Sequence, residues 1–208
     1  MPEPIELEIY SDFNCAWCYF DKMSVKRLIR NYVIRTVWHA FPLHPDLPDE
    51  GLRIEHLFGN NIPLMTEKMR QLESKAAALG LRLAKRTTIS DSRLAQELAK
   101  WAETKGRLEA YHDAIYKAYF DSGLNIADPS VLLDIVDLLK LSRDEAKSVL
   151  EKRSFSQAVD DDWGRSEKLK IMVAPTYILS QDRLAGSQSF EKLEQLLHKN
   201  GVAKRMNS

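Results

Sequence analysis

The apolar positions of the first 41 residues predict a strand, a helix and a second strand. Residues 5–10 (IELEIY) alternate apolar and polar side chains with the two-residue period of a β-strand. From Cys15 to Tyr32 the apolar positions recur at helical spacing, with lysines and arginines between them. Residues 33–41 (VIRTVWHAF) are rich in β-branched and aromatic side chains, which favours a second strand. A right-handed crossover would make the two strands parallel.

The middle of the chain is predicted to be almost entirely helical. Prolines at positions 42, 45 and 48 interrupt regular structure, and helical periodicity then extends from about residue 63 to residue 169. Capping residues and terminal glycines divide this stretch into separate helices. The expected helices are 63–79, 91–105, 108–120, 129–140, one that starts at the capping box of residues 142–145, and 154–170.

Strand patterns return near the C-terminus. Residues 175–180 (PTYILS) are typical of a strand, and residues 183–186 could pair with it as a short hairpin. Ser189 is a candidate cap for a last helix over residues 190–199. The element order is therefore βαβ, a helical block, then ββα.

This order predicts an α/β fold in which a four-stranded mixed sheet carries helices on its faces and is interrupted by a long all-helical insertion. The expected parts are residues 1–48 for the first half of the sheet domain, 49–169 for the insertion and 170–208 for the second half.

Composition and charge exclude several functional classes. The 208 residues carry 30 Lys and Arg against 30 Asp and Glu, so no basic surplus is present to bind nucleic-acid phosphates. No window approaches the roughly 18 apolar residues of a membrane helix, and no secretory signal is visible. We therefore expect a cytoplasmic protein without nucleic-acid or membrane partners. The acidic run Asp160–Asp162 is expected to be a solvated helix face rather than a metal site.

The two cysteines form the motif Cys15-Ala16-Trp17-Cys18. Two cysteines placed at random would stand three apart only about once in a hundred chains of this length. Asn14 is a favourable N-cap, which would make Cys15 the first helical residue, close to unpaired backbone amides that stabilise a thiolate. Cys18 would follow one turn later. We expect Cys15 to be the exposed attacking thiol and Cys18 the more buried resolving thiol.

Two structural interpretations compete with this chemistry. A zinc site would need about two further ligands, and the chain has no third cysteine. His39 and His44 have a spacing that zinc ligands use, but Pro42 lies between them and no helix presents the pair on one face. Inert, packed cysteines are the other alternative, which the strand–turn–helix location disfavours. No metal is therefore expected.

Several segments together resemble the thioredoxin superfamily, specifically its DsbA-like members. They are the CxxC at a helix start, Val173-Ala174-Pro175-Thr176 before a late strand, and the long helical block. Further stretches are similar to the FrnE-like dithiol oxidoreductases, relatives of 2-hydroxychromene-2-carboxylate isomerases and kappa-class glutathione transferases. These stretches are residues 11–19 (SDFNCAWCY), 118–126 (AYFDSGLNI) and 186–188 (GSQ).

The resemblance implies a thioredoxin-like fold and a thiol–disulfide oxidoreductase with Cys15 as nucleophile and Cys18 as resolving thiol. It implies that Pro175 is cis and lies beside the disulfide, and that the backbone of Ala174 meets an extended substrate. The segment from Phe41 to Leu43 would help to line the groove. The implied partners are protein or small-molecule thiols and disulfides. No cofactor is implied beyond redox partners such as glutathione.

Two other functions stay open from the sequence. A glutathione-dependent isomerase or transferase could use the same fold, but the isomerase relatives typically carry serine where this chain has Cys15. A non-catalytic peptide-binding or chaperone-like module could instead use an apolar groove around Phe13, Trp17 and Phe41. The sequence identifies neither the substrate nor whether the chain is a monomer or a homodimer.

Overall fold

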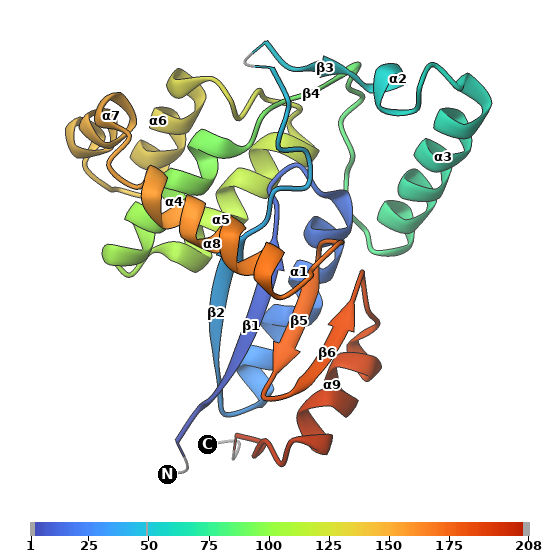
Figure 1. The fold of residues 1–208 in the computed structure, drawn as a ribbon, viewed down its shortest axis with the longest axis vertical. Helices are drawn as coiled ribbons and strands as arrows, with labels where there is room; N and C mark the ends of the chain where they lie inside the picture. The colour runs from blue at the N-terminus through green and yellow to red at the C-terminus, as the bar shows by residue number, and fades with distance from the viewer. Residues whose placement is uncertain (1–2, 49, 206–208) are drawn as a thin grey trace. The chain divides into compact units, whose positions relative to one another are not determined.

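The structure, a computed structural model, describes residues 3–48 and 50–205. The chain forms two compact units, one made of Met1–Leu43 with Asp162–Ser208 and the other of His44–Asp161. The described elements of the first unit are β1 (Ile5–Ser11), α1 (Ala16–Asn31), β2 (Ile34–Ala40), the second half of α8 (Ser156–Lys168), β5 (Thr176–Leu179), β6 (Asp182–Ala185) and α9 (Phe190–Lys199) (Figure 1).

The first unit is built on a four-stranded sheet with the strand order β2-β1-β5-β6. β1 and β2 run parallel, in a register from Ile5 opposite Ile34 to Ser11 opposite Ala40. β5 pairs antiparallel with both β1 and β6. This is the mixed sheet that the sequence predicts, so the predicted fold class is confirmed.

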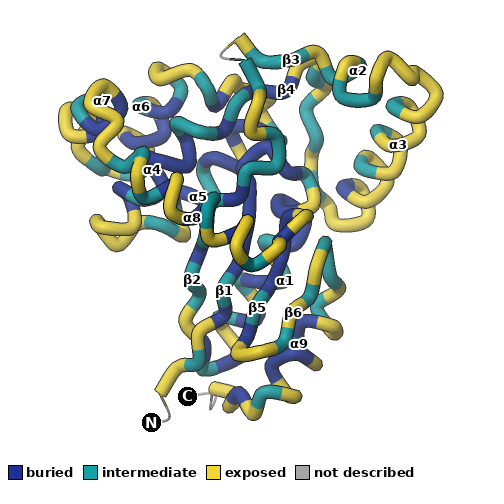
Figure 2. Tube along the Cα trace, viewed as in Figure 1, coloured by how far each residue is buried: buried dark blue, intermediate teal, exposed yellow. Residues whose placement is uncertain are grey.

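β1 is a central strand, and its C-terminal half is the most buried part of the sheet. Leu7, Ile9 and Tyr10 are at most 1% exposed, and the strand darkens toward its C-terminal end in Figure 2. α1 follows directly and buries Phe20, Val25 and Leu28 along one face, as its helical spacing of apolar residues requires. A buried strand end followed by a packed helix gives the connecting turn two fixed ends.

The second unit is mainly helical, as predicted. Its described elements are β3 (Leu52–Arg53), α2 (Ile54–Leu57), α3 (Ile62–Ala78), β4 (Thr88–Ile89), α4 (Arg93–Thr104), α5 (Leu108–Tyr116), the π-helix η1 (Lys117–Asp121), α6 (Pro129–Leu138), α7 (Arg143–Lys152) and the first residues of α8. Two predicted caps are confirmed. The Asp128 carboxylate accepts the Ser130 amide at 2.8 Å, and the Ser142 hydroxyl accepts the Glu145 amide at 3.2 Å.

Some helix boundaries and small elements differ from the prediction. The helix expected over residues 108–120 divides into α5 and the π-helix η1, whose wider turn an apolar pattern does not reveal. The two-residue strands β3 and β4 pair with each other, and they are too short to show any alternation in the sequence. None of the helices in the described ranges is long and apolar enough to cross a membrane.

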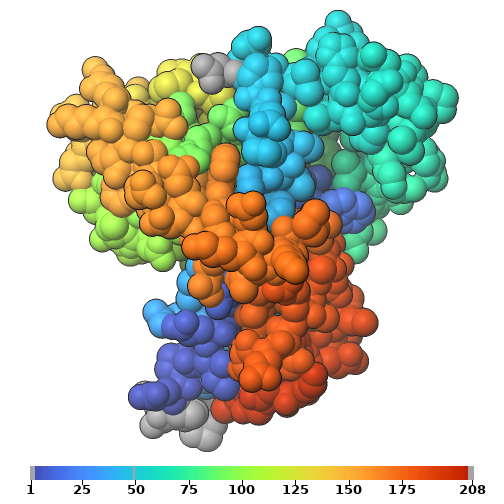
Figure 3. All heavy atoms as spheres, viewed as in Figure 1, coloured from blue at the N-terminus to red at the C-terminus, as the bar shows by residue number. Residues whose placement is uncertain are grey.

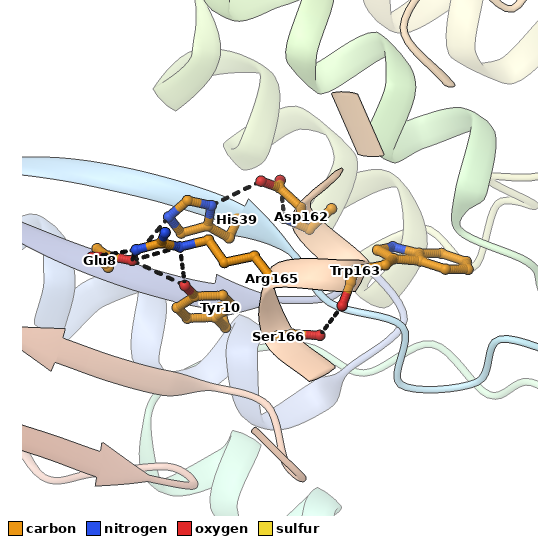
Figure 4. Close-up of polar contacts among 8 residues, drawn as sticks. Glu8, Tyr10, His39, Asp162, Trp163, Arg165 and Ser166 are labelled. Carbon is orange, nitrogen blue, oxygen red and sulfur yellow. Dashed lines mark hydrogen bonds and ion pairs between the residues drawn. The ribbon is translucent and has the colours of Figure 1, made fainter. Parts of the chain in front are cut away.

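The two units divide at residues 43/44 and 161/162, earlier along the chain than the predicted limits of 48 and 169. The second half of α8 therefore belongs with the sheet. Arg165 on this half-helix contacts the Glu8 carboxylate at 2.8 Å and the Tyr10 hydroxyl at 2.7 Å, both on β1 (Figure 4). In the space-filling view the orange atoms of this part of the chain lie on the face toward the viewer (Figure 3).

Asp162 makes a second attachment of α8 to the sheet. Its carboxylate accepts the Ala40 amide at 2.8 Å and lies 2.8 Å from Nδ1 of His39, both on β2. It is 7% exposed, so the expectation of a solvated acidic face was wrong for this residue. Asp160 and Asp161 are exposed, as expected. Buried backbone amides need acceptors, and Asp162 supplies one at the end of β2.

Candidate active site

The turn between β1 and α1 is held by the buried side chain of Asp12. Oδ1 accepts the Asn14 amide at 3.3 Å, and Oδ2 accepts the Leu43 amide at 3.0 Å. The backbone carbonyl of Asp12 accepts the Cys15 amide at 3.2 Å. One residue thus fixes the segment before the dithiol and attaches it to the chain that leaves β2.

Cys15 itself caps α1, rather than Asn14, the cap predicted from the sequence. Its backbone is extended (φ −86°, ψ 111°), and its Sγ accepts the Cys18 amide at 3.4 Å. The first amides of a helix have no intrahelical acceptor, so a side chain at the cap position takes that role. Here the acceptor is the sulfur, and the amide and the positive end of the helix dipole both favour its thiolate form.

Cys18 lies in the first turn of α1 and is 5% exposed. Burial raises the pKa of the Cys18 thiol well above its usual value, and the neighbouring Cys15 raises this pKa further. A hydrogen bond from the Ser11 side chain and one from the Asp12 backbone oppose that rise. Cys18 therefore remains a protonated thiol at neutral pH.

Both cysteines are free thiols, and both are buried. Cys15 is 3% exposed, so the expectation of an exposed Cys15 was wrong. Ala174 is one of the residues that bury Cys15, and its carbonyl oxygen accepts a hydrogen bond from the Cys15 thiol at 3.4 Å. A segment remote in sequence thus closes over the sulfur from the start of β5.

The Ala174–Pro175 peptide bond is cis, as expected from the resemblance. Ala174 and Pro175 are both buried, and β5 begins directly after them. The Thr176 hydroxyl donates to the Val173 carbonyl at 2.7 Å, across the cis bond. The contact between Cys15 and Ala174 shows that this segment lies beside the dithiol.

The predicted aromatic residues differ in exposure. Trp17 is 39% exposed and packs edge-on against Phe20 with ring centroids 5.7 Å apart. Phe13 and Phe41 are buried, at 4% and 5%. Their side chains belong to the core around the turn, so their part in lining a groove stays a prediction.

Sequence reasoning missed one buried group on the dithiol helix. Asp21 is 4% exposed and accepts hydrogen bonds from Tyr177 and from the backbone of Gln188. The signal was present in the spacing. Asp21 falls three residues after Cys18 and four before Val25, on the buried stripe of the helix, where an unpaired charge would be costly.

Of the two histidines considered for zinc, His39 has a ring nitrogen facing each of two carboxylates, those of Asp162 and Glu8 (Figure 4). Within residues 3–48 and 50–205, no group of three or more His, Cys, Asp or Glu side chains is arranged to hold a metal ion.

A mixed sheet with a dithiol at the first turn of its first helix, facing a cis-proline, defines a thioredoxin-fold protein equipped for thiol–disulfide chemistry. The chain belongs to the DSBA-like thioredoxin domain family, which matches residues 6–198. The protein YwbO of Bacillus subtilis (strain 168) is 22% identical over 200 residues, covering 90% of this chain and 94% of YwbO.

Solved structures share the fold over nearly the whole chain. A probable DsbA oxidoreductase from Streptomyces coelicolor has a TM-score of 0.84 at 21% identity, covering 98% of this chain and 93% of that one. A 2-hydroxychromene-2-carboxylate isomerase has a TM-score of 0.78 at 16% identity, with coverages of 95% and 96%. The cytosolic disulfide reductase DsbM of Pseudomonas aeruginosa, solved with glutathione, has a TM-score of 0.68 at 16% identity, with coverages of 94% and 98%.

Proposed function

We propose that the protein is a cytoplasmic thiol–disulfide oxidoreductase in which Cys15 is the nucleophile and Cys18 the resolving thiol. The observation that carries the proposal is the dual contact of the Cys15 sulfur. It accepts the Cys18 amide at 3.4 Å and donates its proton to the Ala174 carbonyl at 3.4 Å. A sulfur with a donor on one side and a substrate-facing backbone on the other is suited to exchange.

The reaction proceeds in two displacement steps. The Cys15 thiolate attacks one sulfur of a substrate disulfide, which forms a mixed disulfide and releases the other substrate sulfur as a thiolate. Cys18 then loses its proton and attacks the Cys15 sulfur. This step forms the Cys15–Cys18 disulfide and releases the reduced substrate. Two molecules of a thiol such as glutathione return the pair to the dithiol: the first forms a mixed disulfide with one cysteine, and the second attacks that mixed disulfide and leaves as oxidised glutathione.

The difference between the two thiols supports these roles. The raised pKa of Cys18 keeps it protonated, so it does not compete with Cys15 for substrate. The Ala174 backbone beside the cis-Pro175 bond is the proposed docking position for the substrate. Trp17, Phe13 and Phe41 are proposed to contribute apolar contacts to protein or small-molecule thiols and disulfides.

Reduction of insulin disulfides by dithiothreitol tests the proposal. We expect the wild-type protein to accelerate the reaction, and we expect Cys15→Ser to lose this acceleration because no nucleophile remains. Cys18→Ser should be strongly impaired, since its mixed disulfide is resolved only by external thiol. Glutathione-dependent turnover of a non-disulfide substrate that survives Cys18→Ser would instead support the isomerase or transferase alternative. Neither activity in a folded protein would support the binding module.

A further inference from the structure

Asp21 is a buried carboxylate on the dithiol helix for which the exchange steps give no role. It lies one helical turn after Cys18 on α1, and only 4% of the residue is exposed. Burying an ionised carboxylate costs several kcal/mol unless hydrogen-bond donors replace its water. The groups that donate hydrogen bonds to the Asp21 carboxylate therefore show which segments this residue connects.

Three donors converge on this carboxylate from elsewhere in the same unit. The Tyr177 hydroxyl, on β5, donates to Oδ2 at 2.8 Å. The Gln188 amide donates to the same oxygen at 2.9 Å, and the Ser187 hydroxyl donates to Oδ1. Ser187 and Gln188 lie in the connection between β6 and α9. One side chain therefore attaches α1 to two segments that are more than 150 residues away.

Two of the elements that Asp21 joins also lie next to the dithiol. α1 carries Cys15 at its N-cap and Cys18 in its first turn, and β5 begins at Thr176, directly after the Ala174–Pro175 cis bond and one residue before Tyr177. The 3.4 Å contact from the Cys15 sulfur to the Ala174 carbonyl spans the same pair of elements. Both contacts therefore join α1 to the segment from Ala174 to Tyr177, one at Cys15 and the other six residues further along the helix at Asp21.

We propose that Asp21 is a positioning residue for the dithiol, a role that rests on the function proposed above. Its carboxylate holds α1 against β5 so that the reduced Cys15 thiol donates to the Ala174 carbonyl. The oxidised pair has no S–H group to donate, so this contact stabilises the reduced form alone. The Asp21 attachment thus sets part of the balance between the dithiol and the disulfide.

The test is the equilibrium of the dithiol with glutathione buffers, measured by alkylation and mass spectrometry. Asp21→Asn keeps the side-chain shape but leaves a single acceptor oxygen for three donors. Weakening one hydrogen bond of the reduced form should raise the equilibrium constant for oxidation about threefold to tenfold. Tyr177→Phe removes one donor and leaves the carboxylate in place. Tyr177→Phe should raise the equilibrium constant for oxidation by a smaller factor than Asp21→Asn. If Asp21→Asn does not fold, Tyr177→Phe alone tests the proposal.

Asp182→Asn is the matched control. Asp182 lies on β6 in the same unit and accepts from Lys199 at 2.5 Å and Asn200 at 2.9 Å, which are the last residue and the C-cap of α9, so these hydrogen bonds join β6 to α9 rather than α1 to β5. It should leave the constant within about twofold of wild type.

Two results would overturn the proposal, and they differ in meaning. Asp21→Asn and Tyr177→Phe constants equal to that of the control, with a lowered Tm, would mean that Asp21 supports folding only. A wild-type dithiol that fails to equilibrate with glutathione would overturn the oxidoreductase function and this role together.

Discussion

The Cys15 sulfur has two hydrogen-bond partners that favour different states of the same atom. The Cys18 amide stabilises a thiolate, whereas the Ala174 carbonyl stabilises a thiol. In the disulfide form this sulfur has neither a negative charge for the amide to stabilise nor an S–H proton to donate to the carbonyl. We therefore expect two backbone groups, which substitutions reach only indirectly, to influence the reactivity and redox balance of this sulfur. The CxxC spacing predicts the proposed attacking thiol, but the two hydrogen-bond partners of that thiol depend on folded geometry.

The raised pKa of Cys18 predicts how stability changes in mild alkali. An unfolded cysteine titrates near roughly 8.5, while the folded Cys18 keeps its proton to higher pH. Its contribution to the free energy of unfolding is therefore fully present below about pH 8.5 and is lost as pH rises, by about 1 kcal/mol per pH unit. Urea titrations of the reduced protein between about pH 7.5 and 9.5 measure the loss.

Cys18→Ser is the control for this pH dependence, because it removes the titrating group and keeps Cys15. Its stability should fall less steeply over the same range. The pKa values of Tyr10 and Tyr32 are raised to about 12, so they affect stability only at higher pH. Equal slopes for the reduced wild type and Cys18→Ser would contradict the account.

Among the elements, predictability from sequence follows the local signal. Helices with side-chain caps, such as α6 after Asp128 and α7 after Ser142, are predictable because the cap chemistry lies in the sequence. The π-turn of η1 and the two-residue strands β3 and β4 leave no such signal. The cap of α1 was misassigned because asparagine is the commoner cap, and only the backbone angles at Cys15 reveal the sulfur in that role.

α8 shows how a tertiary contact overrides a surface pattern. The acidic run of residues 160–162 is typical of a solvated face, yet its last residue turns onto β2 and satisfies the Ala40 amide. Asp21 on α1 is a similar case. In both helices, the carboxylate acquires its role from donors that are remote in sequence.

Asp162→Ala should therefore destabilise the sheet unit by about 1–3 kcal/mol, since it leaves the Ala40 amide and the His39 ring without this acceptor. Asp161→Ala is the matched control. Asp161 is the preceding residue on the same helix, is exposed and accepts only from Gln157 at 3.0 Å, so its loss should cost no more than about 0.5 kcal/mol. Urea denaturation compares the two. Similar costs would mean that the buried contact contributes nothing.

For the whole molecule, the order of strands and the helical insertion follow from the sequence, because each strand and helix carries its own periodicity. The pairing of β5 with β1 does not, since antiparallel contacts across more than 160 residues depend on packing of the complete chain. The β5–β6 hairpin is local and is predicted from the sequence. The candidate site likewise has a part that the sequence predicts and a part that depends on the fold. The two cysteines and Asp21 stand close together in the sequence, whereas Ala174, Pro175 and Tyr177 come near them only through the fold.

Covalent trapping tests the central claim, that Cys15 attacks and Cys18 resolves, most directly. Cys18→Ser and Cys15→Ser, each with one remaining thiol, are incubated with glutathione disulfide at neutral pH and followed by mass spectrometry. The account predicts that Cys18→Ser rapidly gains the mass of one glutathione at Cys15, because the sulfur there accepts the amide at the helix start. Cys15→Ser should react far more slowly, because burial keeps the Cys18 thiol protonated. Equal trapping at the two positions, or faster trapping at Cys18, would contradict the account.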